Sequence, residues 1–406
     1  MSLAEQLDSL LSEDLATVRE RESSALDRIL AECGGRCVLF GAGSLGRSVL
    51  RCLARDGIQP LAIADNNPAL WHTSIDGVPV LPPADAARLH GTEAAFFVTI
   101  WREGHRYAEP HEQLVSLGVS RVFPVAALRW KYSCELLPFL CQDLPHKVYE
   151  ERELVTAAFH LWADDRSRDQ YLRQIRYRAL GDYLGMTAPD RETSYFPGSL
   201  YSLRTDEVFV DCGAYDGDTI RELLRRCGNA FARIVAVEPD AANFVAIERY
   251  LKGLHPEVAR RIQVHLCAVA DRTGQICFSS GGDTGSAISA GADTLVDAAR
   301  LDDLIRDVAP TFIKMDIEGA EVDALNGARR LITWYHPLLA ICLYHRQNDL
   351  WRIPLLIHSI HPGYRFFLRA HEADGWQTVG YAIPPERLRE GDTAPPAATS
   401  HACLAF

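Results

Sequence analysis

The chain has 406 residues, of which 48% are hydrophobic and 24% are charged, and its formal net charge is −12. This composition is typical of a soluble globular protein that is long enough for two domains. The negative charge argues against nucleic acid and anionic membranes as partners, because both require clustered Lys and Arg side chains. We therefore expect a protein that binds neither.

The 11 cysteines include no CxxC pair, and several of them lie within apolar runs. Cysteine behaves as a small buried hydrophobe at such positions, and an odd count without zinc-like spacing argues against a disulfide framework. The first residues lack the basic start and apolar core of a signal peptide, and no apolar run reaches the ~20 residues that span a bilayer. These features predict reduced thiols and a cytoplasmic protein.

Residues 1–32 carry leucines at helical spacing between acidic residues, which predicts an amphipathic N-terminal helix. Its apolar stripe is expected to pack on its own chain or on a second copy in a homodimer. Residues 33–135 then alternate short apolar strands with helical stretches, the pattern of a parallel sheet covered on both faces. The strands expected here are Cys37–Phe40, Leu61–Ala64, Ala94–Thr99 and Arg121–Pro124.

A glycine-rich loop follows the first of these strands. Gly41, Gly43 and Gly46 have G-x-G-x-x-G spacing and open a helix, and Asp65 ends the next strand about 20 residues later. Together these features predict a Rossmann-like nucleotide site.

The segment after this site resembles a second known pattern. Ala64–Pro68 and Gly77–Leu81 are similar to the N-terminal nucleotide-sugar-binding domain of certain bacterial sugar acetyltransferases. The likeness implies a nucleotide or nucleotide sugar as a second ligand of the chain. Alternatively, the glycines serve only helix–strand packing and the domain binds nothing.

Residues 136–200 have the pattern of a helical connector, and residues 201–385 that of a second alternating domain. The tail, 386–406, has little to bury and is expected to be mobile. The fold class is therefore α/β, with two doubly wound domains joined by helices. The strands expected in the second domain are Val208–Val210, Ile234–Val237, Ile262–Leu266, Phe312–Met315 and Leu339–Leu343.

The first strand of the second domain runs into a loop with D-x-G-x-x-x-G spacing. Its glycines, Gly213 and Gly217, allow the backbone to approach a ligand closely, with Ala214 and Tyr215 between them. The acid that starts this loop, Asp211, would repel a pyrophosphate, yet it suits the ammonium and sulfonium groups of S-adenosylmethionine. The loop therefore predicts a site for this cationic cofactor.

Helix starts and strand ends around this loop carry further candidate residues. Asp218 or Thr219 is expected to cap the helix that follows the loop. The second strand ends in Glu238 and Pro239, about 20 residues after the last loop glycine, where an acid binds ribose hydroxyls; capping of the next helix is the competing role for Glu238. The third strand leads to Ala268, which would line the adenine or form a simple turn.

The fourth and fifth strands end in candidate catalytic residues. Asp316 is the first candidate for positioning or deprotonating an acceptor hydroxyl, a role that supplies ~10²–10⁴ in rate, and His345 is the second. The competing roles are structural for His345 and helix-terminal charge for Glu318 and Glu321. Asp316, Glu318 and His345 could also hold a divalent ion, although the sequence alone predicts no metal.

Several stretches of the second domain resemble the FkbM family of methyltransferases, over roughly residues 195–384. The resemblance implies a class I methyltransferase fold, S-adenosylmethionine as the donor, and transfer to an oxygen of a carbohydrate or natural product. The stretches are Tyr195–Pro197, Asp206–Thr219, Ile313–Glu321, Tyr344–His345 and Asp349–Trp351.

The same resemblance implies roles for individual residues. Asp211, Gly213 and Gly217 would cradle the cofactor, Glu238 would hold its ribose, and Asp316 would lie at the reaction centre. We therefore interpret the chain as an S-adenosylmethionine-dependent O-methyltransferase that acts on a hydroxyl of a sugar, glycan precursor or natural product. Two alternatives stay open: an NAD-dependent oxidoreductase, for which we find no Tyr-x-x-x-Lys proton donor in the first domain, and a non-catalytic nucleotide- or sugar-nucleotide-binding protein.

Overall fold

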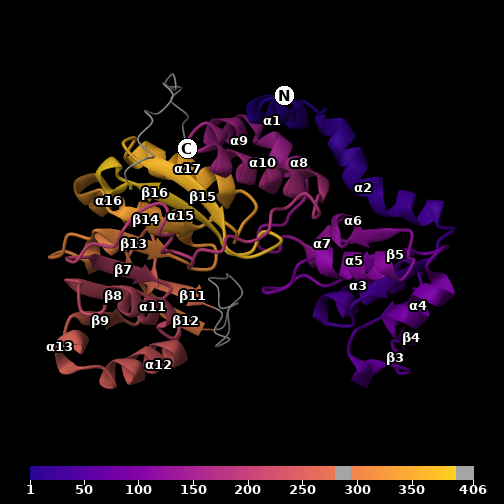
Figure 1. The fold of residues 1–406 in the computed structure, drawn as a ribbon, viewed down its shortest axis with the longest axis horizontal. Helices are drawn as coiled ribbons and strands as arrows, with labels where there is room; N and C mark the ends of the chain where they lie inside the picture. The colour runs from indigo at the N-terminus through magenta and orange to yellow at the C-terminus, as the bar shows by residue number, and fades with distance from the viewer. Residues whose placement is uncertain (279–293, 390–406) are drawn as a thin grey trace. The chain divides into compact units, whose positions relative to one another are not determined.

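The computed structural model describes residues 1–278 and 294–389, and it divides into two compact units. Both units contain strands and helices that alternate along the chain, so the predicted α/β class is confirmed (Figure 1). The segment 136–200, which we expected to be a connector, contributes residues to both units, and most of the expected mobile tail lies outside the described residues. Unit 1 consists of Met1–Glu153, Asp169–Pro189 and Glu372–Trp376, and unit 2 of Leu154–Arg168, Asp190–His371 and Gln377–Phe406.

The N-terminal segment forms two helices, α1 (Leu3–Leu11) and α2 (Leu15–Glu32), so the expectation of a single helix was wrong. The break occurs at Asp14, whose carboxylate accepts hydrogen bonds from the amides of Ala16 and Thr17 and so starts a new helix. Helix α2 packs against α6 (Ala126–Lys131) and α8 (His146–Glu150) of its own unit. Its apolar stripe is therefore buried within unit 1.

Unit 1 is built on a six-stranded sheet with the order β3-β4-β2-β1-β5-β6, parallel except for β3. The four expected strands are present with slightly different ends, and the β3–β4 hairpin was not expected. The strands are β1 (Cys37–Phe40), β2 (Ala62–Ala64), β3 (Ser74–Ile75), β4 (Val78–Leu81), β5 (Ala95–Val98) and β6 (Val122–Pro124). The remaining helices of this part of the chain are α3 (Ser44–Arg55), η1 (Pro68–Leu70), α4 (Pro83–His90), α5 (Ala108–Ser116), α7 (Ser133–Leu136), α9 (Arg152–Phe159) and α10 (Asp165–Leu180).

Unit 2 is built on a seven-stranded sheet with the order β15-β16-β14-β13-β7-β8-β9, which Figure 1 shows strand by strand. The five strands from β14 to β9 are parallel, and β16 is antiparallel to both β14 and β15. Strand order reverses between β7 and β13, the position at which open α/β sheets bind ligands. The strands are β7 (Val208–Cys212), β8 (Arg233–Val237), β9 (Ile262–His265), β13 (Phe312–Met315), β14 (Leu338–Cys342), β15 (Arg365–Ala370) and β16 (Thr378–Ile383).

The centre of this sheet is a buried layer that is apolar except for Asp211 in β7 and Lys314 in β13. All five residues of β14 and all four of β13 are buried, as the uninterrupted runs of a parallel sheet covered on both faces predict. The rings of Phe209 and Phe312 meet edge to face, 5.0 Å between centroids, across neighbouring strands. The helices of this unit are α11 (Asp218–Cys227), α12 (Ala241–Lys252), α13 (Pro256–Ala259), α14 (Leu301–Leu304), α15 (Glu321–Asn326), α16 (Arg329–Tyr335), α17 (Asp349–Ile360) and η2 (Pro385–Arg387).

A small third sheet that the sequence did not predict has the order β10-β12-β11. Its strands are β10 (Ala268–Val269), β11 (Gly274–Phe278) and β12 (Thr294–Ala299). Ala268 packs with Ala270 and Ala298 in a satellite core between these strands. The contacts of Ala268 in the structure are thus those of a packed sheet residue.

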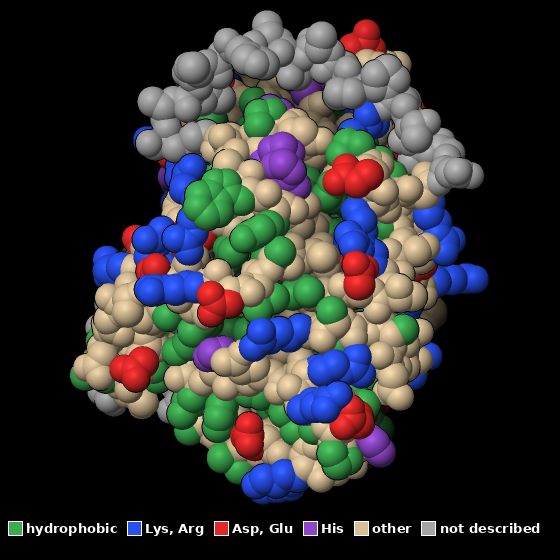
Figure 2. Space-filling view, turned by 90° about the vertical axis from the view of Figure 1, so that its left-hand side faces the viewer, with side chains coloured by type: hydrophobic (Ala, Val, Ile, Leu, Met, Phe, Trp, Pro, Cys, Tyr) green, Lys and Arg blue, Asp and Glu red, His purple; other side chains and the backbone are tan. Residues whose placement is uncertain are grey.

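The face in Figure 2 carries Lys and Arg side chains with acidic and apolar groups between them, and no continuous basic stripe crosses it. Among the helices that the structure describes, none combines the length and the hydrophobicity that crossing a bilayer requires.

Candidate active site at the carboxyl ends of β7, β8, β13 and β14

The loop after β7 contacts the loop after β13 through backbone atoms. Gly213 has a φ of +77°, and a Cβ atom built on it would lie 1.9 Å from the carbonyl oxygen of Asp316. Any larger residue would therefore push these two loops apart. This close approach couples the predicted cofactor loop to the predicted catalytic carboxylate.

The helix after the glycine loop starts differently from our expectation. Neither Asp218 nor Thr219 caps α11, because the N-cap is Gly217, which has a left-handed φ of +89° and no side chain to accept a hydrogen bond. Helix α11 therefore begins at Asp218, directly after this glycine. The first amides of this helix are therefore not satisfied by a side-chain cap.

Glu238, at the end of β8, reaches back to the glycine loop. Its Oε2 accepts a hydrogen bond from the amide of Tyr215 at 2.8 Å, and its Oε1 accepts one from the amide of Asp240 at 3.0 Å. The competing idea that Glu238 caps the next helix is wrong, because Asp240 caps α12 by accepting from two amides. Burial raises the pKa of Glu238, and the two backbone hydrogen bonds oppose that shift.

Asp211 lies within β7 and forms a buried ion pair. Its Oδ1 is 3.0 Å from Nζ of Lys314, and the side chains are 0% and 2% exposed. Lys314 also donates to the carbonyl oxygen of Gly213 at 2.6 Å. The carboxylate of Asp211, which we expected to favour a cationic cofactor, is thus paired with a lysine of the neighbouring strand.

The ionisation of this pair follows from its burial and its charges. Burial raises the pKa of Asp211 to about 6, against the opposing effect of Lys314. Burial alone would lower the pKa of Lys314, but the charge of Asp211 holds it above its ordinary range. Both groups are therefore charged at neutral pH.

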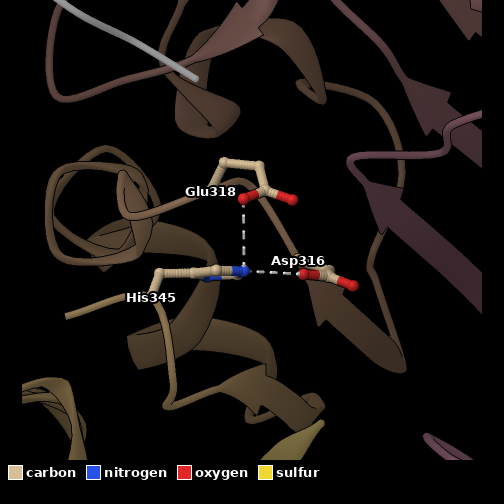
Figure 3. A group of neighbouring side chains, drawn as sticks. All are labelled: Asp316, Glu318 and His345. Atoms are coloured by element: carbon tan, nitrogen blue, oxygen red, sulfur yellow. Dashed lines mark ion pairs between the residues drawn. The ribbon is translucent and has the colours of Figure 1, made fainter. Parts of the chain in front are cut away.

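Asp316 and His345, predicted from separate strands, lie next to each other. Nε2 of His345 is 3.2 Å from Oδ1 of Asp316 and 3.7 Å from Oε2 of Glu318, as Figure 3 shows. On its other side, Nδ1 of His345 is 2.8 Å from Oε1 of Glu321. Glu321 is fully buried and also accepts from the amide of Ile317, so it orients the imidazole in addition to starting α15.

The charges around this imidazole shift the pKa values of both predicted catalytic groups. Burial alone would lower the pKa of His345, but the carboxylates of Glu321 and Asp316 raise it well above its ordinary value. Burial alone would raise the pKa of Asp316, but His345 and Lys314 lower it below its usual range.

Residues that sequence reasoning did not assign complete this site. Tyr195 donates its hydroxyl to Oδ2 of Asp316 at 2.7 Å, and its ring lies 5.2 Å from Nζ of Lys314. A lysine inside an otherwise apolar strand was a usable signal for Lys314, because a buried ammonium requires a partner. Tyr195 had no local signal beyond its place in the family-like pattern.

The predicted nucleotide site of unit 1 shows the same connection between a glycine loop and an acid. Oδ2 of Asp65 accepts from the amide of Ala42 at 2.7 Å, between Gly41 and Gly43. A Cβ atom on Gly46 would lie 1.9 Å from the carbonyl oxygen of Gly41. Helix–strand packing therefore accounts for Gly46 without a ligand.

Comparisons with known proteins agree with the fold of unit 2. Residues 211–373 match the Methyltransferase FkbM domain. A crystal structure of Methyltransferase FkbM from Methylobacillus flagellatus KT superposes with a TM-score of 0.72 at 25% identity, covering 94% of this chain and 98% of that one. These matches identify a methyltransferase, in which residues 211–373 form an FkbM methyltransferase domain.

Other matches are partial. A putative rRNA methylase from Clostridium thermocellum covers 45% of this chain and 88% of its own, with a TM-score of 0.31 at 10% identity. Precorrin-6y C5,15-methyltransferase from Geobacter metallireducens GS-15 covers 45% of this chain and 83% of its own, with a TM-score of 0.29 at 14% identity. Scores this low support no argument about function. No curated protein matches the chain significantly.

Proposed function

We propose that this protein transfers the methyl group of S-adenosylmethionine to a hydroxyl oxygen of a sugar, a glycan precursor or a natural product. The observation that supports the proposal most directly is the backbone contact between Gly213 and Asp316. It brings a loop of the kind that binds this cofactor against a carboxylate that can act on an acceptor.

The residues at the end of β8 fit the cofactor. Each oxygen of Glu238 accepts one backbone amide, and a carboxylate oxygen has room for a second hydrogen bond. The side chain of Asn243 also hydrogen-bonds to this carboxylate, which leaves one oxygen position free for a ribose hydroxyl on a carboxylate already held in place. Gly213 and Gly217 would hold the rest of the cofactor, since neither presents a side chain to it.

When bound, S-adenosylmethionine supplies an electrophilic methyl group on a positively charged sulfur. Asp316 would position the acceptor hydroxyl or accept its proton; the methyl–sulfur and O–H bonds would break as the methyl–oxygen bond forms, and neutral S-adenosylhomocysteine would be the leaving group. Tyr195 fixes Asp316 through Oδ2, which leaves Oδ1 facing His345. Oδ1 also accepts a hydrogen bond from the hydroxyl of Tyr344 at 3.4 Å, so both oxygens of Asp316 are held in position.

Transfer of labelled methyl groups tests the reaction. The full chain is incubated with methyl-labelled S-adenosylmethionine and a panel of saccharides, nucleotide sugars and hydroxylated natural products. We expect label in an acceptor, and a loss of about 10²–10⁴ in rate for Asp316→Asn. Asp323→Asn, which removes an exposed carboxylate of α15, is the matched control and should keep full activity. Full turnover of Asp316→Asn across pH would contradict the role of Asp316.

Cofactor affinity tests the donor site separately. Glu238→Ala removes charge-assisted hydrogen bonds of about 1.5–3 kcal/mol, so affinity for S-adenosylmethionine should fall roughly ten- to a hundredfold. Asp65→Ala removes the equivalent carboxylate of unit 1 and should leave this affinity unchanged. Unchanged calorimetric binding by Glu238→Ala would remove the assignment of Glu238.

The proposal includes two further expectations. The ten cysteines that the structure describes are all free, which supports a cytoplasmic protein, and determination of the compartment by fractionation tests this. The nucleotide site of unit 1 stays a prediction. A thermal-shift panel of NAD, UDP-sugars and CoA esters tests it, and the lack of any effect would favour a purely structural role for Gly41, Gly43 and Gly46.

A further inference from the structure

The side chains of Asp316, Glu318 and His345 lie together at the ends of β13 and β14. One ligand atom from each is within 4.8 Å of the other two. In Figure 3 the imidazole points its Nε2 toward both carboxylates. The three side chains are 20%, 25% and 1% exposed, in that order, so the group reaches solvent from the carboxylate side.

The second observation concerns the imidazole itself. Nδ1 faces the buried carboxylate of Glu321, an acceptor, so Nδ1 bears a proton and Nε2 is the atom turned toward the cluster. Within the described residues, Nε2 of His345 is buried without a hydrogen-bond partner, although a carboxylate oxygen lies 3.2 Å away. A buried imidazole nitrogen aimed at two carboxylates is satisfied either by a proton or by a metal ion bound between the three side chains.

The arrangement around His345 is the one that metal-binding histidines adopt. A ligating imidazole almost always donates its other N–H to a carboxylate, which fixes the tautomer and the ring. Glu321 occupies that outer position here, and it is fully buried. An ion and a proton compete for Nε2, because metal ligands bind in their deprotonated form.

The spacing of the ligand atoms fits one ion. At metal–ligand distances of about 2.1 Å, two ligands at right angles are about 3.0 Å apart. The measured separations from Nε2, 3.2 Å to Asp316 and 3.7 Å to Glu318, are close to that value. Two carboxylates and one neutral imidazole also match the double charge of the ion.

We propose that Asp316, Glu318 and His345 form a binding site for one divalent cation of the Mn²⁺ or Mg²⁺ class. Carboxylate oxygens select these hard ions, and a single imidazole is compatible with Mn²⁺. Three protein ligands leave coordination positions open. On the proposed function, an open position takes the acceptor hydroxyl, whose pKa the ion lowers. Asp316 and His345 then act on the acceptor through the ion.

Mn²⁺ alone is the probe for this site, measured by electron paramagnetic resonance and calorimetry on the full chain. The wild type should bind one Mn²⁺, and Glu318→Gln should weaken binding by about tenfold or more. Glu318 is the most exposed of the three ligands, so this variant should fold. Asp323→Asn is the matched control and should bind Mn²⁺ as the wild type does. Lack of Mn²⁺ binding by the wild type at 1 mM (on the order of weak extracellular sites), or equal binding by Glu318→Gln, overturns the site.

A spectroscopic signature and a cofactor measurement separate this inference from the proposed function. Nitrogen coupling in the Mn²⁺ pulsed spectrum should be present in the wild type and absent in His345→Gln. Glu318→Gln should bind S-adenosylmethionine as tightly as the wild type does. If the wild type binds Mn²⁺ but not S-adenosylmethionine, the proposed function fails and the site stands. If methyl transfer persists in excess EDTA, the role given to the ion is overturned.

Discussion

Gly213 and Gly217 belong to one loop and both have positive φ, yet a methyl group should affect them differently. Alanine at either position pays about 1–2 kcal/mol for the left-handed backbone. At Gly213 the new Cβ would also meet the carbonyl oxygen of Asp316 at 1.9 Å, a backbone atom that cannot move alone. At Gly217 the nearest atom is 3.6 Å away, an ordinary contact. Overpacking of this kind costs about 1–3 kcal/mol more, so Gly213→Ala should lose roughly 2–5 kcal/mol.

Scanning calorimetry of the full chain measures this difference. For a unit of this size, 1 kcal/mol corresponds to about 2–4 °C in Tm. The transition of Gly213→Ala should therefore lie below that of Gly217→Ala by about 2–12 °C, and that of Gly217→Ala should lie about 2–8 °C below the wild type. Equal transition temperatures for the two variants would refute the backbone contact between the glycine loop and Asp316.

Three further predictions concern buried carboxylates. Lys314→Met leaves Asp211 buried without its partner and should lower the free energy of unfolding in urea by about 3–5 kcal/mol. Adding Asp211→Asn should restore part of this loss. A double variant that is no more stable than Lys314→Met would argue against the ion pair. Asp302 accepts from the amides of two residues of α16 at 3.1 and 3.0 Å, so Asp302→Ala should cost about 1–3 kcal/mol, and an unchanged Tm would contradict it. Burial raises the pKa of Asp374 from 3.8 to about 6, so the stability that its neutral form provides is complete below about pH 4 and is lost as the pH rises through 6. The Tm of Asp374→Asn should therefore fall less than that of the wild type between pH 4 and 6, and parallel curves would exclude this contribution.

The central strands could be predicted because a buried parallel strand is an uninterrupted apolar run. Phe312–Met315 was predicted with its observed ends, and the strand that contains Asp211 with its observed start. Strands β15 and β16 were missed, because the pattern of the sequence after Ile360 does not separate these antiparallel strands from loops. The three-stranded sheet around Ala268 was missed because it forms between short segments that are distant in the sequence.

A candidate site residue could be selected from the sequence where it directly follows a predicted strand. Glu238 and Asp316 were selected in this way, because each directly follows a parallel strand at the edge where open α/β sheets bind ligands. Contacts between residues that are far apart in the sequence could not be predicted from it. The bond from Tyr195 to Asp316 joins residues 121 positions apart, and the contact of Glu321 with His345 joins two different loops. Such pairs follow from the fold and not from local spacing.

The hydrogen bond from a glycine-loop amide to the acid one strand away occurs in both units, from Ala42 to Asp65 and from Tyr215 to Glu238. An acid about 20 residues after a glycine loop therefore contributes to the architecture, because its hydrogen bond holds the loop against the next strand. A protein that has lost its nucleotide would still be expected to retain that acid. Each oxygen of Asp65 also accepts one backbone amide, from Ala42 and from Asn67, so neither the spacing nor the hydrogen bonds of the acid distinguish a loop that binds ribose from one that does not.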